Sequence, residues 1–162
     1  MDEISAPPLP QPAAALLPHR PPMLFVETLI ARHGNRATAR AVLPDSGICV
    51  SGNRLVPEYF IELIAQATAL ANGYDGLCLG RPVHDGMLVG IESFSFHGRA
   101  LNGSKEGNIA GSIAGRVVRI ETEKTFEFGA IKVIHGEVYD DRELLAAGDI
   151  KVWEDLGRDA TR

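Results

Sequence analysis

The sequence contains little that would mark a secreted, membrane-spanning or disulfide-stabilised protein. It has only two cysteines, Cys49 and Cys78, whereas a secreted domain held together by disulfides normally carries more. No apolar run approaches the roughly 20 residues needed to cross a bilayer, and the first residues lack the basic and apolar stretches of a signal peptide. These absences predict a cytoplasmic protein with no membrane span.

Positive charge and recognisable cofactor motifs are also scarce. The net charge of −5 argues against non-specific nucleic-acid binding, which requires a basic face. The five histidines have no partner four residues away and form no cluster with cysteine, so we expect no metal site. A phosphate-binding glycine loop, a dinucleotide fingerprint and a Gly-x-Ser-x-Gly elbow are all missing, so we expect no cofactor.

The length and composition predict one domain with a short tail. A chain of 162 residues with 45% hydrophobic residues can fill one core but not two. Residues 1–15 hold four prolines among alanines, which favours extended or disordered chain. We therefore expect a flexible tail over 1–15 and a single domain over 16–162.

Hydrophobic periodicity predicts an α+β fold in which most of the chain is strand. A hairpin is expected around Gly34 and Asn35, and a second turn at Asp140 and Asp141. Because no long helical pattern separates the later strands, the sheet should be largely antiparallel. The expected strands are 23–32, 36–43, 87–97, 108–121, 125–138 and 143–153.

One helix is predicted over about residues 57–73. Pro57 suits a first helical turn and Gly73 suits a terminating left-handed residue. At 100° per residue, Glu58, Glu62 and Gln66 form one polar stripe, whereas the larger apolar residues and Tyr59 fall on the face expected to pack on the sheet.

This polar stripe has a functional and a structural interpretation. Two desolvated carboxylates one turn apart would suit acid/base chemistry, but the same residues also fit an ordinary solvated helix face. His19, held between prolines and Arg20, and His97, at a strand end, could supply a ring nitrogen to a site or could be structural histidines.

Two segments together resemble a known family. Residues 17–27 read LPHRPPMLFVE and residues 61–67 read IELIAQA. This pair is similar to the motifs of the hotdog-fold 3-hydroxyacyl-(acyl carrier protein) dehydratases, and the PHRPPM lead-in is most similar to the dehydratase-like branch associated with aryl polyene biosynthesis.

The resemblance implies a hotdog fold, in which an antiparallel sheet wraps around one central helix, and a dimer with an acyl tunnel at its interface. It implies elimination of water from a 3-hydroxyacyl thioester in fatty acid or polyene biosynthesis, with Glu62 as the catalytic carboxylate. Gln66, Glu58 and His97 are then candidate substrate-binding residues, and His19 is a second catalytic candidate. The implied partners are an acyl carrier protein or coenzyme A thioester and a second hotdog chain, identical or related.

The sequence departs from the family pattern before the helix. The family has a His-Phe-Pro-Gly motif where this chain reads ICVSG over 48–52, and a helix-start glycine near Pro57. Two alternatives therefore stay open: a hotdog acyl thioesterase that uses Glu62 without a histidine, and a non-catalytic subunit that pairs with an active dehydratase. An acidic carrier would need positive charge, for which we consider Arg20, Arg81, Arg99 and Arg116.

Overall fold

A computed structural model describes residues 6–52, 54–98 and 113–155 of the chain. Seven strands form one antiparallel sheet in the order β1-β2-β3-β7-β8-β9-β6, and two short strands form a separate ribbon, β4-β5. The elements are β1 (Gln11–Pro12), α1 (Ala13–Leu16), β2 (Thr28–His33), β3 (Arg36–Val42), β4 (Val50–Ser51), β5 (Arg54–Leu55), α2 (Glu58–Cys78), β6 (Gly86–Phe96), β7 (Val117–Phe128), β8 (Ile131–Asp140) and β9 (Glu143–Glu154).

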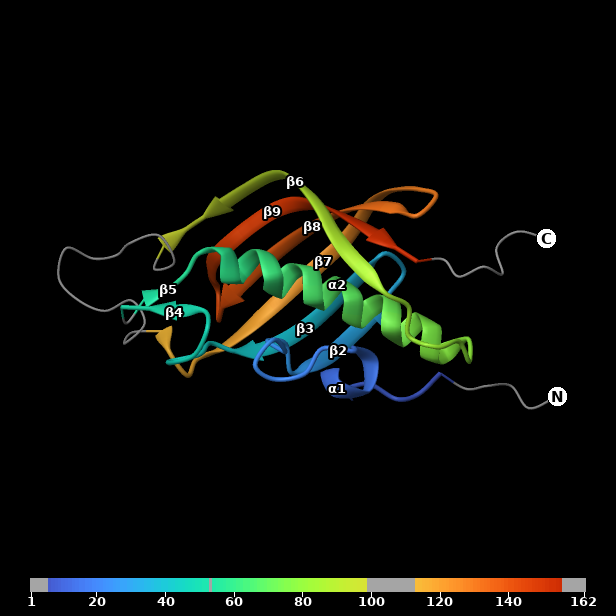
Figure 1. Ribbon diagram of the computed structural model, residues 1–162, viewed down its shortest axis with the longest axis horizontal. Coiled ribbons are helices and arrows are strands. Elements are labelled where there is room, and N and C mark those ends of the chain that lie inside the picture. Colours follow the sequence, from blue (N-terminus) through green and yellow to red (C-terminus); the bar gives the residue numbers. More distant parts are fainter. Residues whose placement is uncertain (1–5, 53, 99–112, 156–162) are drawn as a thin grey trace.

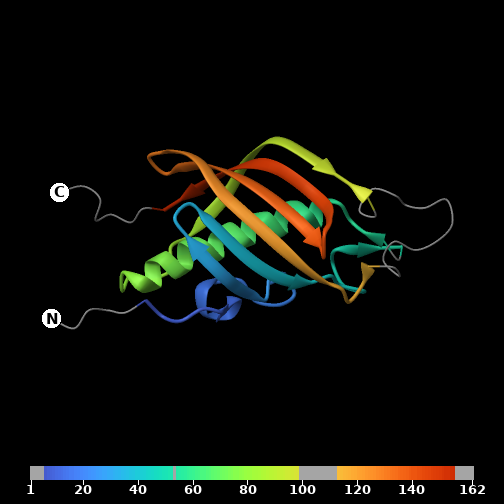
Figure 2. The ribbon, with the colours of Figure 1, turned by 180° about the vertical axis from the view of Figure 1, so that it is seen from behind.

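The sheet curves around α2, which covers one of its faces while the other face stays open (Figures 1 and 2). Along β8 the side chains alternate strictly between buried and half-buried positions, as expected for a strand with one face on the core. Gly136 of β8 faces the helix, where an added Cβ would lie 2.3 Å from Cγ2 of Ile64. The predicted α+β arrangement of an antiparallel sheet around one long helix is therefore confirmed.

The helix is longer than the sequence predicts. It runs to Cys78, and its end is set by Gly80, which has φ +63°. Gly80 N donates to the carbonyl of Leu77, and Arg81 N donates to the carbonyl of Gly76 at 2.8 Å. This pair of hydrogen bonds is the Schellman arrangement that closes a helix with a left-handed glycine.

Gly73 does not end the helix, as the sequence predicts, but allows a close contact with α1. A Cβ at this position would lie 2.2 Å from the backbone oxygen of Leu16. The absence of a side chain therefore lets α1 pack directly on the helix, and Ala13, Leu16 and Leu17 are buried there. The predicted tail boundary at residue 15 is wrong, because residues 11–15 already belong to β1 and α1.

The strand predictions fail in two places. The strand expected from residue 23 begins only at Thr28. The preceding residues 18–27, which include the prolines of the lead-in, form neither helix nor strand. The strand expected over 108–121 begins at Val117 and continues to Phe128, where Gly129, with φ +57°, turns the chain into β8. Residues 108–112 lie outside the described residues. The hairpin at Gly34 and the turn at Asp141 are confirmed.

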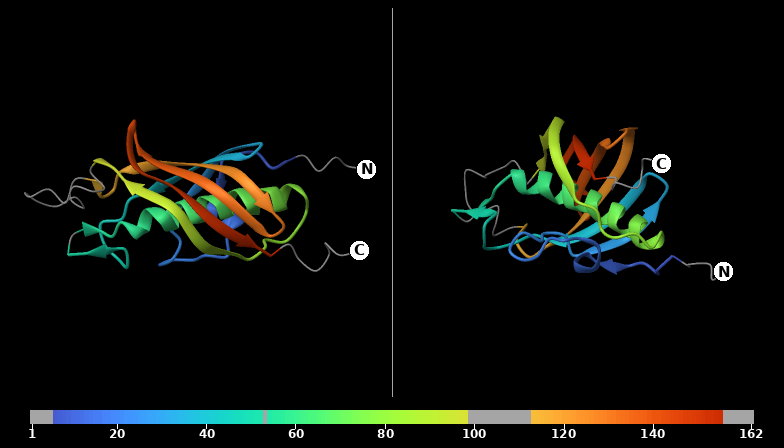
Figure 3. Two further views of the ribbon diagram at one scale, coloured as in Figure 1. Left: turned by 90° about the horizontal axis from the view of Figure 1, so that it is seen from above. Right: turned by 45° about the vertical axis from the view of Figure 1, so that its right-hand side comes forward.

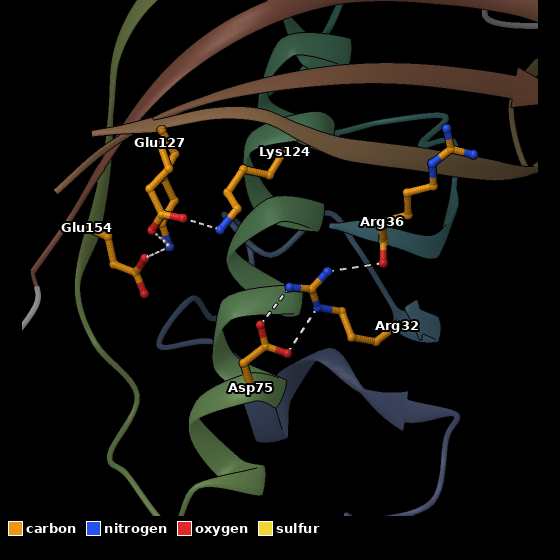
Figure 4. A network of polar contacts seen from close by, with 7 residues as sticks. Arg32, Arg36, Asp75, Lys124, Glu127 and Glu154 are labelled. Atoms are coloured by element: carbon orange, nitrogen blue, oxygen red, sulfur yellow. Dashed lines mark hydrogen bonds and ion pairs between the residues drawn. The ribbon is translucent and has the colours of Figure 1, made fainter. Parts of the chain in front are cut away.

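Polar contacts tie the helix to the sheet (Figure 4). The guanidinium of Arg32 donates from Nε and Nη2 to the Asp75 carboxylate at 3.0 and 2.6 Å, and from Nη1 to the Arg36 carbonyl. This two-bond pair joins β2 to the last third of α2 in a fixed orientation. Within the sheet, buried Lys132 of β8 pairs with Glu154 of the neighbouring β9. Neither described helix is both long and apolar enough to cross a membrane.

The contact between Gly73 and Leu16 predicts opposite effects for two glycines of the same helix. Gly73→Ala should lower the free energy of unfolding by about 2 kcal/mol or more, because the backbone of α1 must move. Gly76→Ala should raise it by about 0.5–1 kcal/mol, since an added Cβ meets only ordinary contacts at 3.6 Å and the unfolded chain loses freedom. Urea unfolding of both variants tests this, and equal effects would contradict the close packing of α1.

Candidate functional site

The buried amide of Gln66 organises the region around the helix stripe. Gln66 is 1% exposed. Its Oε1 accepts hydrogen bonds from the backbone N–H groups of Phe25 and Val26, at 2.9 and 3.4 Å. Its Nε2 donates to the carbonyl of Met23 at 2.7 Å and to Oε1 of Glu62 at 2.8 Å. All four hydrogen-bonding positions of the amide are therefore occupied by the protein itself.

This arrangement fixes the orientation of the amide and of the neighbouring carboxylate. Two backbone N–H groups can bond only to an oxygen, so the amide nitrogen must face Glu62. Oε1 of Glu62 accepts that bond, which leaves Oε2 as the oxygen available to a ligand. The sequence predicts Gln66 as a substrate-binding residue, but in the structure it positions Glu62 and anchors residues 23–26 on α2.

Glu62 stands where two hollows meet. The first has a volume of about 240 Å³ and follows the small residues Ala65 and Ala69 toward Asn72, against the start of β6 and the end of β9. The second has a volume of about 420 Å³ and extends toward the start of α2 between the 23–25 segment, the 48–49 loop and β6. Both hollows share Glu62 and Leu88.

The two hollows differ in chemistry. Besides Glu62, the first contains the ring of His19 and the side chains of Gln66 and Asn72. The second is lined mostly by apolar side chains, together with Glu58, Cys49 and Tyr59; the apolar ones are Met23, Phe25, Ile48, Val56, Ile61, Leu88 and Ile91. A ligand that reaches Glu62 can thus place a polar portion on one side of the carboxylate and an apolar portion on the other.

His19 lines the first hollow together with Glu62. Its Nδ1 is the buried polar side-chain atom of the described chain that has no hydrogen-bond partner. An unpaired N–H at that position would cost more than an unpaired lone pair, so the neutral ring keeps its proton on Nε2. His19 is therefore equipped to donate a hydrogen bond rather than to accept a proton from a substrate.

The other predicted site residues are divided between the second hollow and the edge of the sheet. Glu58 lines the second hollow one turn before Glu62. His97 lines neither of the two hollows and lies at the end of β6, where its Nε2 is 2.8 Å from Oγ of Ser95. The structure of one chain therefore brings His19, Glu58 and Gln66 to Glu62, but not His97.

Cys49 lies in the segment 48–52, where the resembling family has its His-Phe-Pro-Gly motif. It faces the apolar hollow near Glu62, and burial, together with the negative charge of Glu62, raises the pKa of its thiol. Because the thiolate is the nucleophilic form, this environment disfavours a nucleophilic role. Across the described residues, no three histidine, cysteine or acidic side chains converge in a way that could hold a metal ion.

Sequence reasoning missed the contribution of β6 to this site. Leu88 and Ile91 line the hollow opposite α2, and both are more than a third exposed. A register shift between Leu88 and Gly90 lies between these two residues and lets both side chains line the same hollow. Strict alternation would have put them on opposite faces, so only the apolar character of the strand pointed to a binding surface.

Comparison with known proteins agrees with this fold. In the solved ApeI:P dehydratase heterocomplex of Xenorhabdus doucetiae, a chain matches with TM-score 0.73 and 19% identity, over 90% of this chain and 91% of that one. Protein PH1136 of Pyrococcus horikoshii matches with TM-score 0.58 and 13% identity, over 91% and 96%. The smu.793 protein of Streptococcus mutans, solved bound to acetyl CoA, matches with TM-score 0.56 and 13% identity, over 85% and 94%.

These likenesses confirm the hotdog fold that the sequence resemblance implied. The profile of the ApeP-like family, described as ApeP dehydratase, matches residues 11–160. The chain therefore belongs to the ApeP-like dehydratase family, which agrees with the predicted aryl polyene-associated branch. No curated protein sequence matches it.

The buried amide predicts a large stability effect at one glutamine and a small one at another. Gln66→Leu should lower the free energy of unfolding by about 3 kcal/mol, because it leaves the backbone groups of residues 23–26 unpaired. Gln11→Leu removes a single exposed hydrogen bond to the Pro8 carbonyl and should cost under about 0.5 kcal/mol. Chemical denaturation of the two variants measures the difference, and similar values would mean that the amide is not the anchor.

Proposed function

We propose that this chain is a dehydratase subunit that eliminates water from a 3-hydroxyacyl thioester, with the Glu62 carboxylate as the catalytic group. The observation that carries the proposal is the placement of Glu62, held by Gln66 at the junction of two hollows. Membership of the ApeP-like dehydratase family supports the reaction type. The acetyl CoA bound by the similar Streptococcus mutans protein supports a thioester as the ligand class.

The geometry suggests how the reaction proceeds. Oε2 of Glu62 takes the proton from C2 of the substrate, and the electron pair moves into the thioester. The C3–O bond then breaks, and the same carboxyl returns its proton to the departing oxygen, so that one water leaves. His19 donates its Nε2–H to the 3-hydroxyl oxygen and holds it near the carboxyl.

This scheme uses one carboxyl group for both proton transfers. It requires no histidine in the loop before the helix, where this chain has Cys49. The reacting carbons lie between the two hollows, with C3 and its hydroxyl on the side of His19 and the thioester on the side of the apolar hollow. Of the basic residues considered for carrier binding, Arg20 and Arg81 are exposed, Arg116 is paired with Asp140, and Arg99 lies outside the described residues.

Glu62→Gln tests the assignment directly. With a 3-hydroxyacyl thioester as substrate, formation of the 2-enoyl product should fall by about 100- to 10,000-fold, because the amide cannot carry the proton. Glu121→Gln, on the open face of the sheet, should retain full turnover. Product analysis by mass spectrometry measures both. Full activity of Glu62→Gln would refute the proposal, and release of free thiol without enoyl product would identify a thioesterase instead.

The proposal also includes a second hotdog chain, which pairs with this one along β6. Among the described strands, β6 is the last in the order of the sheet and lies at its edge (Figure 3), and it exposes Met87, Val89 and Ile91 by 49–60% beside the two hollows. Apolar side chains along a free strand edge favour pairing with another strand. The Xenorhabdus doucetiae heterocomplex supports a related hotdog chain as the partner, although an identical copy would use the same edge.

Val89→Lys should therefore weaken assembly, because it puts a charge at this strand edge without altering either hollow. Sedimentation of the wild-type chain, alone and mixed with a related hotdog dehydratase, should show a dimer in at least one case. The variant should shift that dimer toward monomer, whereas Phe128→Lys, at an exposed hairpin end, should not. A variant that dimerises as tightly as the wild type would rule out the β6 edge.

A further inference from the structure

His19 lacks the hydrogen bond that commonly orients a histidine in an active site. In many such sites one ring nitrogen faces the substrate and the other bonds to a carboxylate or a backbone carbonyl, which fixes the ring. Nδ1 of His19 is buried without a hydrogen-bond partner, and Nε2 is the nitrogen that the proposed reaction uses. The position of the ring in the hollow therefore depends on packing and on the backbone that carries it.

The backbone around His19 is restricted by prolines on both sides. Pro18 has a fixed φ, and Leu17 and Arg20, which each precede a proline, are biased toward extended conformations. Leu17 accordingly has φ −123° and ψ 147°. Between the carbonyls of Leu17 and His19, three torsions escape this restriction, namely ψ of Pro18 and both φ and ψ of His19.

Arg20 spans these three torsions with one nitrogen. Its Nη1 donates to the carbonyl of Leu17 at 2.8 Å and to the carbonyl of His19 at 2.7 Å. Nη1 carries two hydrogens, one for each carbonyl, and because the guanidinium is planar and charged, the two bonds are strong and fixed in direction. The carbonyls on either side of the free torsions are thus held relative to each other.

The chain on each side of this bridge is already anchored. Before it, the amide of Leu17 donates to the Ala13 carbonyl at 2.9 Å, and α1 packs closely on α2. After it, the amide of Met23 donates to the Arg20 carbonyl at 2.9 Å, and Gln66 binds the carbonyl of Met23. The bridge therefore acts on the one part of this segment that neither the prolines nor these anchors determine.

Building on the role proposed for His19, we infer that Arg20 is a positioning residue, whose guanidinium bridge directs the Nε2–H of His19 toward the 3-hydroxyl oxygen of the substrate. Arg20 contacts no reacting atom. It is also a candidate contact for an acidic carrier protein, and its exposure fits either role. A positioning role differs in one respect, because loss of Arg20 should then slow the reaction even of a substrate that carries no protein.

A double-mutant cycle with a small 3-hydroxyacyl pantetheine thioester tests this coupling. Arg20→Ala should lower kcat for enoyl formation about 10-fold, because a misdirected donor no longer holds the hydroxyl. In a His19→Ala background the same change should have no further effect, since the residue that it positions is absent. Arg36→Ala removes an exposed arginine that pairs with Glu123, and this matched control should retain full turnover.

Three results would overturn the inference. They are full activity of Arg20→Ala, losses that multiply in the double variant, and a loss that is confined to carrier-linked substrate. The last result would identify Arg20 as a carrier contact instead.

A measurement of backbone motion separates this inference from the dehydration itself. The nitrogen-15 order parameter of the His19 amide should be about 0.85 in the wild type and below about 0.6 in Arg20→Ala, because the three torsions become free. It should keep the wild-type value in Arg36→Ala, and circular dichroism should show that both variants are folded. An unchanged order parameter in Arg20→Ala would refute the bridge. A wild type that eliminates no water would refute the dehydration, while the order parameters would still decide whether Arg20 fixes His19.

Discussion

The geometry of the candidate site depends on one buried side-chain amide. Gln66 holds two segments that lie 40 residues apart in the sequence, because its oxygen binds the 25–26 backbone and its nitrogen binds Met23 and Glu62. The proline-rich lead-in that carries His19 is thereby fixed beside the helix. A buried amide with every position satisfied is rigid, since any movement would leave a polar group unpaired. The same amide that anchors the N-terminal segment thus orients the carboxylate.

The helix can serve both structure and site because its contacts with the rest of the fold are very close. Gly136 lets the sheet approach Ile64, and Gly73 lets α1 rest on the opposite end of the helix. These contacts bury the large apolar residues on one side of α2 and leave Ala65 and Ala69 as the floor of the polar hollow. Small residues there keep space open beside a carboxylate that lies on a firmly packed helix, and such support keeps a site in its working geometry.

The sequence was sufficient to predict the fold class, but it could not predict the contacts that hold Glu62. Helical spacing put Glu62 and Gln66 on one stripe, and the resemblance of two motifs identified the hotdog fold. The contact between Gln66 and residues 23–26 is long-range, so no local pattern predicts it. Gly73 resembled a helix end because a close backbone contact and a terminating turn favour the same residue.

Glu62 is therefore proposed to carry a proton from C2 of a thioester substrate to the oxygen of its 3-hydroxyl group. The substrate lies across the two hollows that meet at Glu62. The most direct measurement is incubation with a 2-enoyl thioester in water enriched in oxygen-18, followed by mass spectrometry. Because elimination and addition of water share one transition state, the account predicts label in a 3-hydroxyl group for the wild type and none for Glu62→Gln. Label that enters only a free carboxylate, with release of the thiol, or a Glu62→Gln variant that labels the 3-hydroxyl as fast as the wild type, would contradict it.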